Sequence, residues 1–565
     1  MNKNLLRSSV SLTGALALLV GCSGEIGSSG SPTSQPTPPA GGSGGTGVVT
    51  NPPPPANAGD PGIGQLRRLN AAQFARALQD LLQGPIANLP AIEEFPANSG
   101  LKAIGASTTA VTQLGVEQYE TAVNFAVNAA FSDATRRTAI VGCAPAAWDD
   151  ACATKFLQTF GRLAWRRPLA ADELARYMKL GQDETADGAT FAGATQSMAA
   201  ALLQSPNFLY RVELGGTKVA GKNYAHYTAY ETATRLAFLF WSATPDAALL
   251  DAAQSGGLDT PAGVAKEAQR LLSSPRAVDG IDEMINDVMG LDAVFMMAKD
   301  PKLYPQLTPT LRTAMRTEVL KMFEDVALTR DADMMEVFDT NKTFVNQELG
   351  SLYGITVTGT DFTSVSQAAD QPRAGFLTTA ALLTVQDKQY QTSPTRRGAF
   401  VRRVLSCDHI PDPPPNVNTN ITPPAGSGPI SRKDLLSGHV KDAACAACHT
   451  LMDPVGLAFE NFDAMAIYRT VDEQGLKIDP SGMMDGKSFA GPRELGTLLR
   501  QSSKARDCLT RNMYRFAMGR VENSYDEAQI STMGQNFVTG GQKFKNFALS
   551  LIGNDGFNNV VPATN

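Results

Sequence analysis

Apolar side chains recur every three or four residues through most of the chain, and this spacing is typical of helices that bury one face. The clearest case runs over residues 70–82, where Phe74, Leu78 and Leu82 fall on the same face. Asn70 stands directly before this segment, where its side chain can cap the first turn. We therefore expect a mainly α fold, a multi-helical body with few short strands.

Two further segments with the same periodicity predict particular packing. A helix is expected over residues 115–131, with Tyr119 and Phe125 turned toward the core. A strongly apolar helix later in the chain contains Arg235. A buried guanidinium needs a carboxylate partner, and Glu231, one turn earlier, is the simplest one.

The pattern changes over residues 340–430. A short helix is expected to begin at Thr343, and Gly354 after it is typical of a helix C-cap. The alternation over 355–365 predicts one or two strands. A proline run at 411–415 predicts an extended connector to the last part of the chain.

The first 22 residues have the pattern of an export signal, not of a folded element. Their short apolar run ends at Leu-Val-Gly-Cys, in which Cys22 occupies the position of the lipid-bearing cysteine of bacterial lipoproteins. The run is too short to span a bilayer, and residues 23–62 are a tether rich in Gly, Ser and Pro. We expect a cell-envelope protein, on the periplasmic or cell-surface side of the outer membrane, anchored by lipid alone.

Composition and charge narrow the range of partners. The 565 residues are 43% hydrophobic, which is enough for several cores, and the formal net charge is −6 at pH 7. Because such a chain presents no basic field, nucleic acid is not expected as a partner.

The strongest chemical signal is the segment Cys-Ala-Ala-Cys-His, which contains Cys445, Cys448 and His449. Two thiols at this spacing can form thioether bonds to the vinyl groups of a haem, and the following histidine can bind the iron. A zinc site would need a second pair of ligands, and the whole chain holds only four histidines. A haem-free redox dithiol is the other alternative, but export favours one covalent haem c.

Two residues are equally good candidates for the second iron ligand, His439 and Met484, and Met518 is a weaker third candidate. His439 precedes His449 by ten residues, so it can reach the iron only if the chain folds back. Met484 lies in a loop before the terminal helices, as a methionine ligand would. Arg469 is expected to pair with a haem propionate, because a guanidinium matches a carboxylate with two parallel hydrogen bonds.

The remaining cysteines predict two disulfides. Seven cysteines less Cys22 and the two haem cysteines leave Cys143, Cys152, Cys407 and Cys508. An even number in an oxidising compartment favours pairing. Cys143 and Cys152 are close in sequence and pair most simply, which leaves Cys407 for Cys508.

Short motifs occur in a fixed order along the chain. They include Arg67-Arg68-Leu69-Asn70, Arg166-Arg167-Pro168-Leu169, Ser205-Pro206-Asn207-Phe208, Ser393-Pro394-Thr395-Arg396-Arg397-Gly398, the Cys-Ala-Ala-Cys-His segment, Asp453-Pro454-Val455-Gly456 and Tyr468-Arg469. Together they resemble the motifs of bacterial multi-domain "domain of unknown function" proteins that end in a planctomycete-type cytochrome-c-like module. The chain departs from that pattern at 465–467, where a glycine is usual, so the turn geometry there is in question.

The resemblance covers nearly all of the chain from Leu66 onward, and it implies a C-terminal cytochrome-c-like haem module. The expected segments are a lipoprotein signal peptide (1–22), a Gly/Ser/Pro linker (23–62), an N-terminal helical domain (63–140), a small helical domain with Cys143 and Cys152 (141–215), a central helical domain (216–355), a connecting domain with a Pro-rich linker (356–430) and the haem domain (431–555). The resemblance implies no particular reaction.

Two classes of function fit these features. The first is electron transfer or redox activity at the cell surface, with a redox partner protein or a small-molecule donor or acceptor. The second is a surface binding protein, for example for polysaccharide, whose haem is ancillary or whose cysteines stay a haem-free dithiol. No catalytic triad, phosphate-binding loop or paired-carboxylate motif stands out in residues 64–430, so no catalytic residue is predicted.

Overall fold

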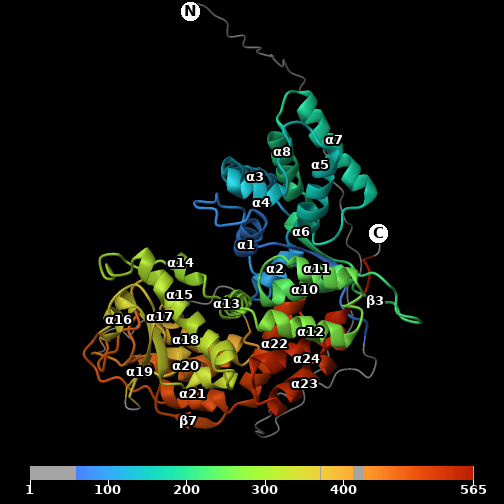
Figure 1. The fold of residues 1–565 in the computed structure, drawn as a ribbon. Helices are drawn as coiled ribbons and strands as arrows, with labels where there is room; N and C mark the ends of the chain where they lie inside the picture. The colour runs from blue at the N-terminus through green and yellow to red at the C-terminus, as the bar shows by residue number, and fades with distance from the viewer. Residues whose placement is uncertain (1–58, 369–370, 412–425, 427, 442, 564–565) are drawn as a thin grey trace, which may run out of the picture. The chain divides into compact units, whose positions relative to one another are not determined.

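A computed structural model describes residues 59–368, 371–411, 426, 428–441 and 443–563. The expected signal peptide, Cys22 and most of the expected linker lie outside these residues. The described chain is mainly helical with a few two-stranded pairs, which confirms the expected fold class (Figure 1). No helix in this part of the chain is long and apolar enough to cross a membrane.

The first group of elements is a set of helices that lie between two strands in the sequence. They are β1 (Gln65–Arg68), α1 (Ala71–Leu81), α2 (Lys102–Thr108), α3 (Gln113–Ser132), α4 (Ala134–Val141), α5 (Asp150–Phe156), η1 (Leu157–Gly161), α6 (Arg162–Trp165), α7 (Ala171–Ala186), α8 (Phe191–Gln204), α9 (Pro206–Leu209) and β2 (Tyr210–Glu213). Strands β1 and β2 pair antiparallel, in a register that sets Arg67 directly opposite Arg211.

The second group is a helical body with one long-range strand pair. Its elements are β3 (Ala225–His226), α10 (Ala229–Phe240), α11 (Ala247–Gln254), α12 (Pro261–Leu272), α13 (Ala277–Met289), α14 (Ala293–Met296), α15 (Pro309–Glu324), η2 (Asp325–Thr329), η3 (Met334–Phe338), β4 (Lys342–Val345), α16 (Gln347–Tyr353) and β5 (Thr363–Ser366). Strand β4 pairs antiparallel with β5, and β3 pairs with the last strand of the chain.

The third group contains the cysteine-histidine segment. Its elements are η4 (Phe376–Thr378), α17 (Ala380–Gln386), α18 (Pro394–Phe400), η5 (Val401–Leu405), α19 (Arg432–His439), α20 (Ala443–Gly456), η6 (Leu457–Phe459), β6 (Gly482–Met484), β7 (Lys487–Phe489), α21 (Pro492–Arg500), α22 (Ser503–Met518), α23 (Ser524–Thr539), α24 (Phe544–Ile552), α25 (Asp555–Asn558) and β8 (Asn559–Val560).

Local sequence signals explain several element boundaries. Asn70 caps α1 as expected, since its Oδ1 accepts a 2.9 Å hydrogen bond from the Gln73 amide. Gly354 ends α16 in the left-handed region, with φ +71°, where glycine is favoured. The helix expected to begin at Thr343 begins instead at Gln347, because the residues before it are paired in strand β4.

The core forms two apolar clusters, one from residues 69–209 with Phe238 and one mainly from residues 233–557. Tyr119 is 2% exposed in the first cluster, as expected, whereas Phe125 is 40% exposed. The prediction for Phe125 was wrong because α3 buries the face of Tyr119, Val123 and Val127. At about 100° per residue, position 125 lies well off that face.

The partner predicted for Arg235 was also wrong. Arg235 pairs with Glu213 of strand β2, not with Glu231. The Glu231 carboxylate instead accepts hydrogen bonds from main-chain amides, at 2.7 Å from Thr228 and 2.7 Å from Leu214. Glu231 therefore caps the start of α10, which leaves Arg235 to find a carboxylate elsewhere in the fold.

The two ends of the described chain run beside each other. The Gly64 amide donates to the Val561 carbonyl at 2.8 Å, and the Val561 amide donates to the Gly62 carbonyl at 2.9 Å. Strands β3 and β8 pair next to this contact. The first described residues are thus held by the last ones.

Candidate functional site

Helix α20 carries Cys445, Cys448 and His449 on one face, because side chains three and four positions apart on a helix lie together. All three side chains are partly exposed. Cys448 Sγ lies 3.6 Å from the Pro411 carbonyl oxygen. Neither cysteine takes part in the disulfides described below. The helix thus presents two sulfur atoms and an imidazole together near the surface.

Asp453, one turn after His449, orients the imidazole. Its Oδ2 lies 2.8 Å from His449 Nδ1, and its Oδ1 accepts a 2.7 Å hydrogen bond from Thr395 Oγ1. Asp453 is 3% exposed, and its hydrogen bond raises the pKa of His449 above the ordinary value, while burial acts in the opposite direction. A carboxylate on Nδ1 is the arrangement that orients metal-ligating histidines, for which Nε2 is the ligating atom.

Two glycines bring α18 to backbone distance from α20. A Cβ atom on Gly398 would lie 1.9 Å from the Met452 carbonyl oxygen, and one on Gly456 would lie 1.7 Å from the Pro394 carbonyl oxygen. Any side chain at either position would force the helices apart. This close approach sets Thr395 against Asp453, so α18 positions the imidazole indirectly.

Arg397 of α18 fixes the chain that follows α20. Its guanidinium is almost fully buried and forms a 2.6 Å ion pair with Asp387, which is also buried. The same guanidinium donates to the carbonyls of Phe459, Phe462 and Asp463, at 2.6, 2.9 and 2.9 Å. Every charge in this contact therefore has a partner, as burial requires.

Arg469, the expected propionate partner, has protein carboxylates around it. Its Nη1 lies 2.8 Å from Glu473, its Nη2 lies 3.6 Å from the Glu460 carboxylate, and its Nε donates to the Glu460 carbonyl at 3.1 Å. Nη2 is buried without a hydrogen-bond partner among the described residues. A role toward a propionate stays a prediction.

Met484, one expected iron ligand, ends strand β6 and is 6% exposed within the core. Its neighbour Met483 points the other way and is 53% exposed. Arg402 holds this hairpin near α20, since it donates to Asp485 at 2.6 Å and to the Leu451 carbonyl at 3.0 Å. The structure thus keeps Met484 in a strand turned toward the core, and its role as ligand stays a prediction.

Of the two other candidate iron ligands, the structure describes the side chain of Met518 but not that of His439. His439 is the last residue of α19, and its side chain lies outside the described set. Met518 ends α22, where its sulfur lies 3.5 Å from Arg235 Nη2. Met518 is therefore engaged at a different site.

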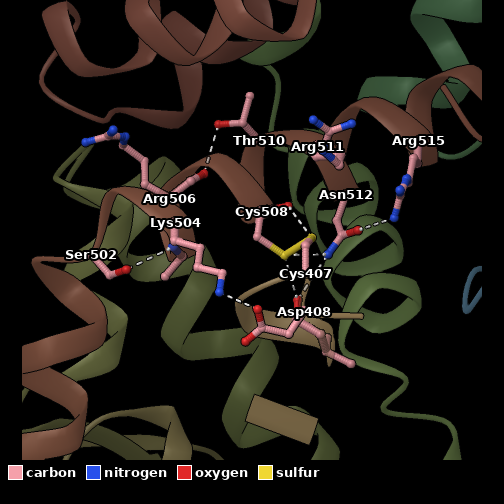
Figure 2. Close-up of a disulfide and its surroundings, with 12 residues drawn as sticks. Cys407, Asp408, Ser502, Lys504, Arg506, Cys508, Thr510, Arg511, Asn512 and Arg515 are labelled. Atoms are coloured by element: carbon pink, nitrogen blue, oxygen red, sulfur yellow. Dashed lines mark hydrogen bonds and ion pairs between the residues drawn. A yellow bond between two sulfur atoms is a disulfide. The ribbon is translucent and has the colours of Figure 1, made fainter. Parts of the chain in front are cut away.

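Both disulfides have the predicted pairing. Cys143 pairs with Cys152, with 6.1 Å between the Cα atoms, and Cys407 pairs with Cys508, with 5.4 Å. Figure 2 shows the second bridge, which ties the end of η5 to α22. Beside it Asn512 donates to the Val404 carbonyl at 3.1 Å. The segment before α20 is thus linked covalently to the C-terminal helices.

The donor set on α20 fits a covalent haem: two partly exposed sulfurs and an imidazole oriented by a buried carboxylate. Across the described residues, no group of three or more His, Cys, Asp and Glu side chains is placed to hold a metal ion. The supporting roles of Thr395 and Gly398 were not predicted from the sequence. The spacing of His449 and Asp453, four residues apart, was the one local signal of that support.

Four family models match successive segments of the chain, and each is described as a "Protein of unknown function". They are DUF1595 at residues 152–213, DUF1592 at 227–355, DUF1588 at 373–472 and DUF1585 at 485–557. The DUF1588 segment contains both α18 and α20, so it crosses the expected boundary at residue 430.

No curated protein and no solved structure matches the chain. The four matched segments follow one another without overlap. The chain is thus a multi-domain protein assembled from segments similar to planctomycete cytochrome-c-like domain families of unknown function.

Proposed function

We propose that the mature protein carries one haem c, bound to Cys445 and Cys448 with His449 on the iron, and that it transfers electrons at the cell envelope. One observation carries this proposal: the sulfurs and the imidazole share one face of α20, and buried Asp453 holds His449 Nδ1 at 2.8 Å. A haem bound there supplies one-electron redox chemistry.

The protein's own groups have distinct tasks in this proposal. Asp453 keeps the imidazole in one orientation and makes it a better electron donor to a metal. Thr395 donates a hydrogen bond to the second carboxylate oxygen of Asp453. This contact keeps the carboxylate from rotating away from the imidazole. The glycine contacts between α18 and α20 keep Thr395 in reach.

The attachment test is a haem stain and a reduced-minus-oxidised spectrum of protein matured with a haem-attachment system. Replacing both Cys445 and Cys448 with Ser should abolish covalent haem. His449→Ala should change the spectrum, whereas His409→Ala, at an exposed histidine, should leave it unchanged. Matured wild-type protein without covalent haem would contradict the proposal.

The same samples distinguish the second ligand. A methionine ligand, as proposed for Met484, gives a weak near-infrared sulfur-to-iron band and a higher potential than a second histidine. Met484→Ala should then remove that band. With His439 as the ligand, the band is absent and His439→Ala opens the iron to carbon monoxide. Carbon monoxide binding by the wild type would exclude both residues.

We further propose that Cys22 carries the lipid anchor. Leu-Val-Gly-Cys at 19–22 supports this, since it ends a short apolar run behind a basic start. Cys22→Ser should release the protein from membranes or leave it unprocessed. Unchanged membrane partition together with unchanged mass would contradict the anchor.

A second candidate function, polysaccharide binding, rests on a cleft of about 1760 Å³ beside α15 and α16. Amide and hydroxyl side chains line it together with Tyr353, Phe362 and Tyr468. Amides can bond sugar hydroxyls in both directions, and aromatic rings cover their apolar faces. Tyr468 is 46% exposed, so Tyr468→Ala should weaken binding to insoluble glycans, with Tyr390→Ala, at a ring outside this lining, as control. Failure of the wild type to bind any glycan would remove this candidate.

A further inference from the structure

A small cavity lies between β1, β2 and α10, and no residue of α20 lines it. Its volume is about 20 Å³, and its lining includes Arg67, Arg68, Arg211 and Arg235. The first two residues belong to β1, Arg211 to β2 and Arg235 to α10. Arg67, Arg211 and Arg235 are at most 5% exposed. A cavity of this size lined by so many guanidinium groups is unusual for an interior, where cations need partners.

The buried charges around this cavity do not balance. Arg67, Arg211 and Arg235 all pair with one carboxylate, Glu213. Three positive charges and one negative charge leave an excess of two. The β1–β2 register sets Arg67 opposite Arg211, which is an unfavourable position for two like charges. Arg166 adds a further cation nearby, and its guanidinium donates to main-chain carbonyls.

The neighbouring charged groups reduce the excess but do not remove it. Arg68 has its own partner in Glu93 at 2.9 Å, and Lys102 has Asp292 at 2.8 Å. Asp287 also lines the cavity, where its two oxygens accept the amides of Lys102 and Ala103, at 2.6 and 2.8 Å. Those donors are neutral, so the Asp287 carboxylate offsets one of the two excess charges and an excess of one remains.

The guanidinium groups also have N–H donors that no acceptor among the described residues satisfies. Arg67 uses its Nη atoms on the carbonyls of Ala517 and Phe516, at 2.8 and 3.1 Å. Arg211 and Arg235 each direct an Nη atom to Glu213. The Nε atoms of all three arginines are buried and find no acceptor among the described residues. Three unused N–H donors on buried cations call for an acceptor that bears negative charge.

From these observations we propose that the cavity binds one monatomic anion, of the size and charge of chloride, between Arg67, Arg211 and Arg235. About 10–15 Å³ is enough for a single water-sized particle, so about 20 Å³ accepts one ion of this kind. Sulfate, phosphate and carboxylate groups are too large for that space. The anion offsets the remaining excess charge and accepts the unused Nε–H groups.

The site has a mechanical consequence for the fold. Arg67 ties β1 to the C-terminal end of α22 through the carbonyls of residues 516 and 517. Burial and the neighbouring Arg211 lower the pKa of Arg67 to about 9. An anion counters that effect and keeps the guanidinium charged. The bound ion therefore stabilises the joint between the N-terminal strand pair and the last helices.

The test compares the thermal unfolding of the full mature protein in sodium chloride and in sodium gluconate at equal ionic strength. A ligand that binds only the folded state raises the melting temperature as its concentration increases. We expect a rise with chloride or bromide that gluconate does not reproduce. Arg211→Met should lose this dependence, whereas Arg176→Met, at an exposed arginine on α7, should keep it.

Crystals grown or soaked in bromide give a second readout that needs no variant. Anomalous density is expected in the cavity, next to the Nε atoms of Arg67, Arg211 and Arg235. Should Arg211→Met fail to fold, this measurement still decides. Equal melting temperatures in chloride and gluconate, with no anomalous density in the cavity, would overturn the proposal and leave a water molecule there.

Discussion

Two buried arginine sites in this protein differ in how the positive charge of the guanidinium groups is compensated. Behind α20, Arg397 has a buried carboxylate, Asp387, at 2.6 Å and three carbonyls as acceptors. Between β1, β2 and α10, three arginines share the single carboxylate of Glu213. The Nε atoms have no acceptor among the described residues at either site, so the sites differ in the number of carboxylates per guanidinium. Both sites are closed to solvent, so the difference is not one of hydration.

The role of a buried guanidinium depends on whether enough carboxylates lie beside it. A guanidinium that has its own carboxylate is a structural anchor, and Arg397 anchors the chain that leaves the cysteine-histidine helix. A group of guanidinium ions that outnumber their carboxylates, by contrast, indicates a missing negative partner. The two sites should therefore respond differently when a partner is removed, and the following changes test that difference in order of expected effect.

Loss of the long-loop disulfide should have the largest effect. Replacing Cys407 and Cys508 with Ser should lower the free energy of unfolding by about 4–5 kcal/mol, because their bridge closes a loop with a sequence separation of 101 residues. The same change at Cys143 and Cys152, separated by 9 residues, should cost about 2–3 kcal/mol. Denaturant unfolding measures both. An equal cost for the two bridges would show that loop closure does not govern them.

Asp387→Ala should destabilise the balanced site by about 3–5 kcal/mol, because it leaves buried Arg397 with only the more distant Glu460 carboxylate, at 3.7 Å. Asp183→Ala removes an exposed ion pair with Lys179 and should cost less than about 1 kcal/mol. Urea unfolding of both variants gives the comparison. Similar costs for the two changes would mean that Arg397 is held mainly by the carbonyls.

Asp453→Asn should lower the pKa of His449 toward its ordinary value in protein that carries no haem. Because the folded-state pKa is raised, the contact with Asp453 stabilises the fold fully below about pH 6.5, the unfolded value. That contribution is lost as the pH rises through the raised pKa. An NMR titration of the imidazole signal measures the change, and an unaltered midpoint in the variant would contradict the assigned cause.

Ala466→Gly should give the smallest effect, a stabilisation of about 1 kcal/mol. Ala466 has φ +61°, a left-handed conformation that costs a residue with a side chain about 1–2 kcal/mol. Ala528→Gly, at an exposed position within α23, should instead cost about 1 kcal/mol. Thermal unfolding distinguishes the two signs. Destabilisation by both changes would mean that the turn at Ala466 is unstrained.

Local signals in the sequence predicted local structure well. Asn70 caps the start of α1 with its side chain, and Gly354 ends α16 because a residue without a side chain adopts a positive φ at little cost. Ala466, within the 465–467 segment where the resembling proteins usually have a glycine, adopts a positive φ. Each of these features depends on a few adjacent residues, so the sequence pattern contains the relevant physics.

Apart from the Cys407–Cys508 bridge, which the cysteine count predicted, long-range contacts could not be predicted from local signals. Arg235 pairs with Glu213, 22 residues away on a strand, because capping occupies the nearer Glu231. Thr395 meets Asp453 across 58 residues, and only the packing of α18 on α20 brings them together. Periodicity indicates which face of a helix is buried and does not indicate what lies against it.

The contact between residues 62–64 and Val561 has a consequence for engineering the chain. Because both ends of the described fold leave from the same place, a short peptide can join them without crossing the molecule. New termini can then open at an exposed turn such as Gly221, which has φ +71° and open space around its Cα. A circular permutant of this kind separates the helical body from residues 1–58 while it keeps the cysteine-histidine helix intact.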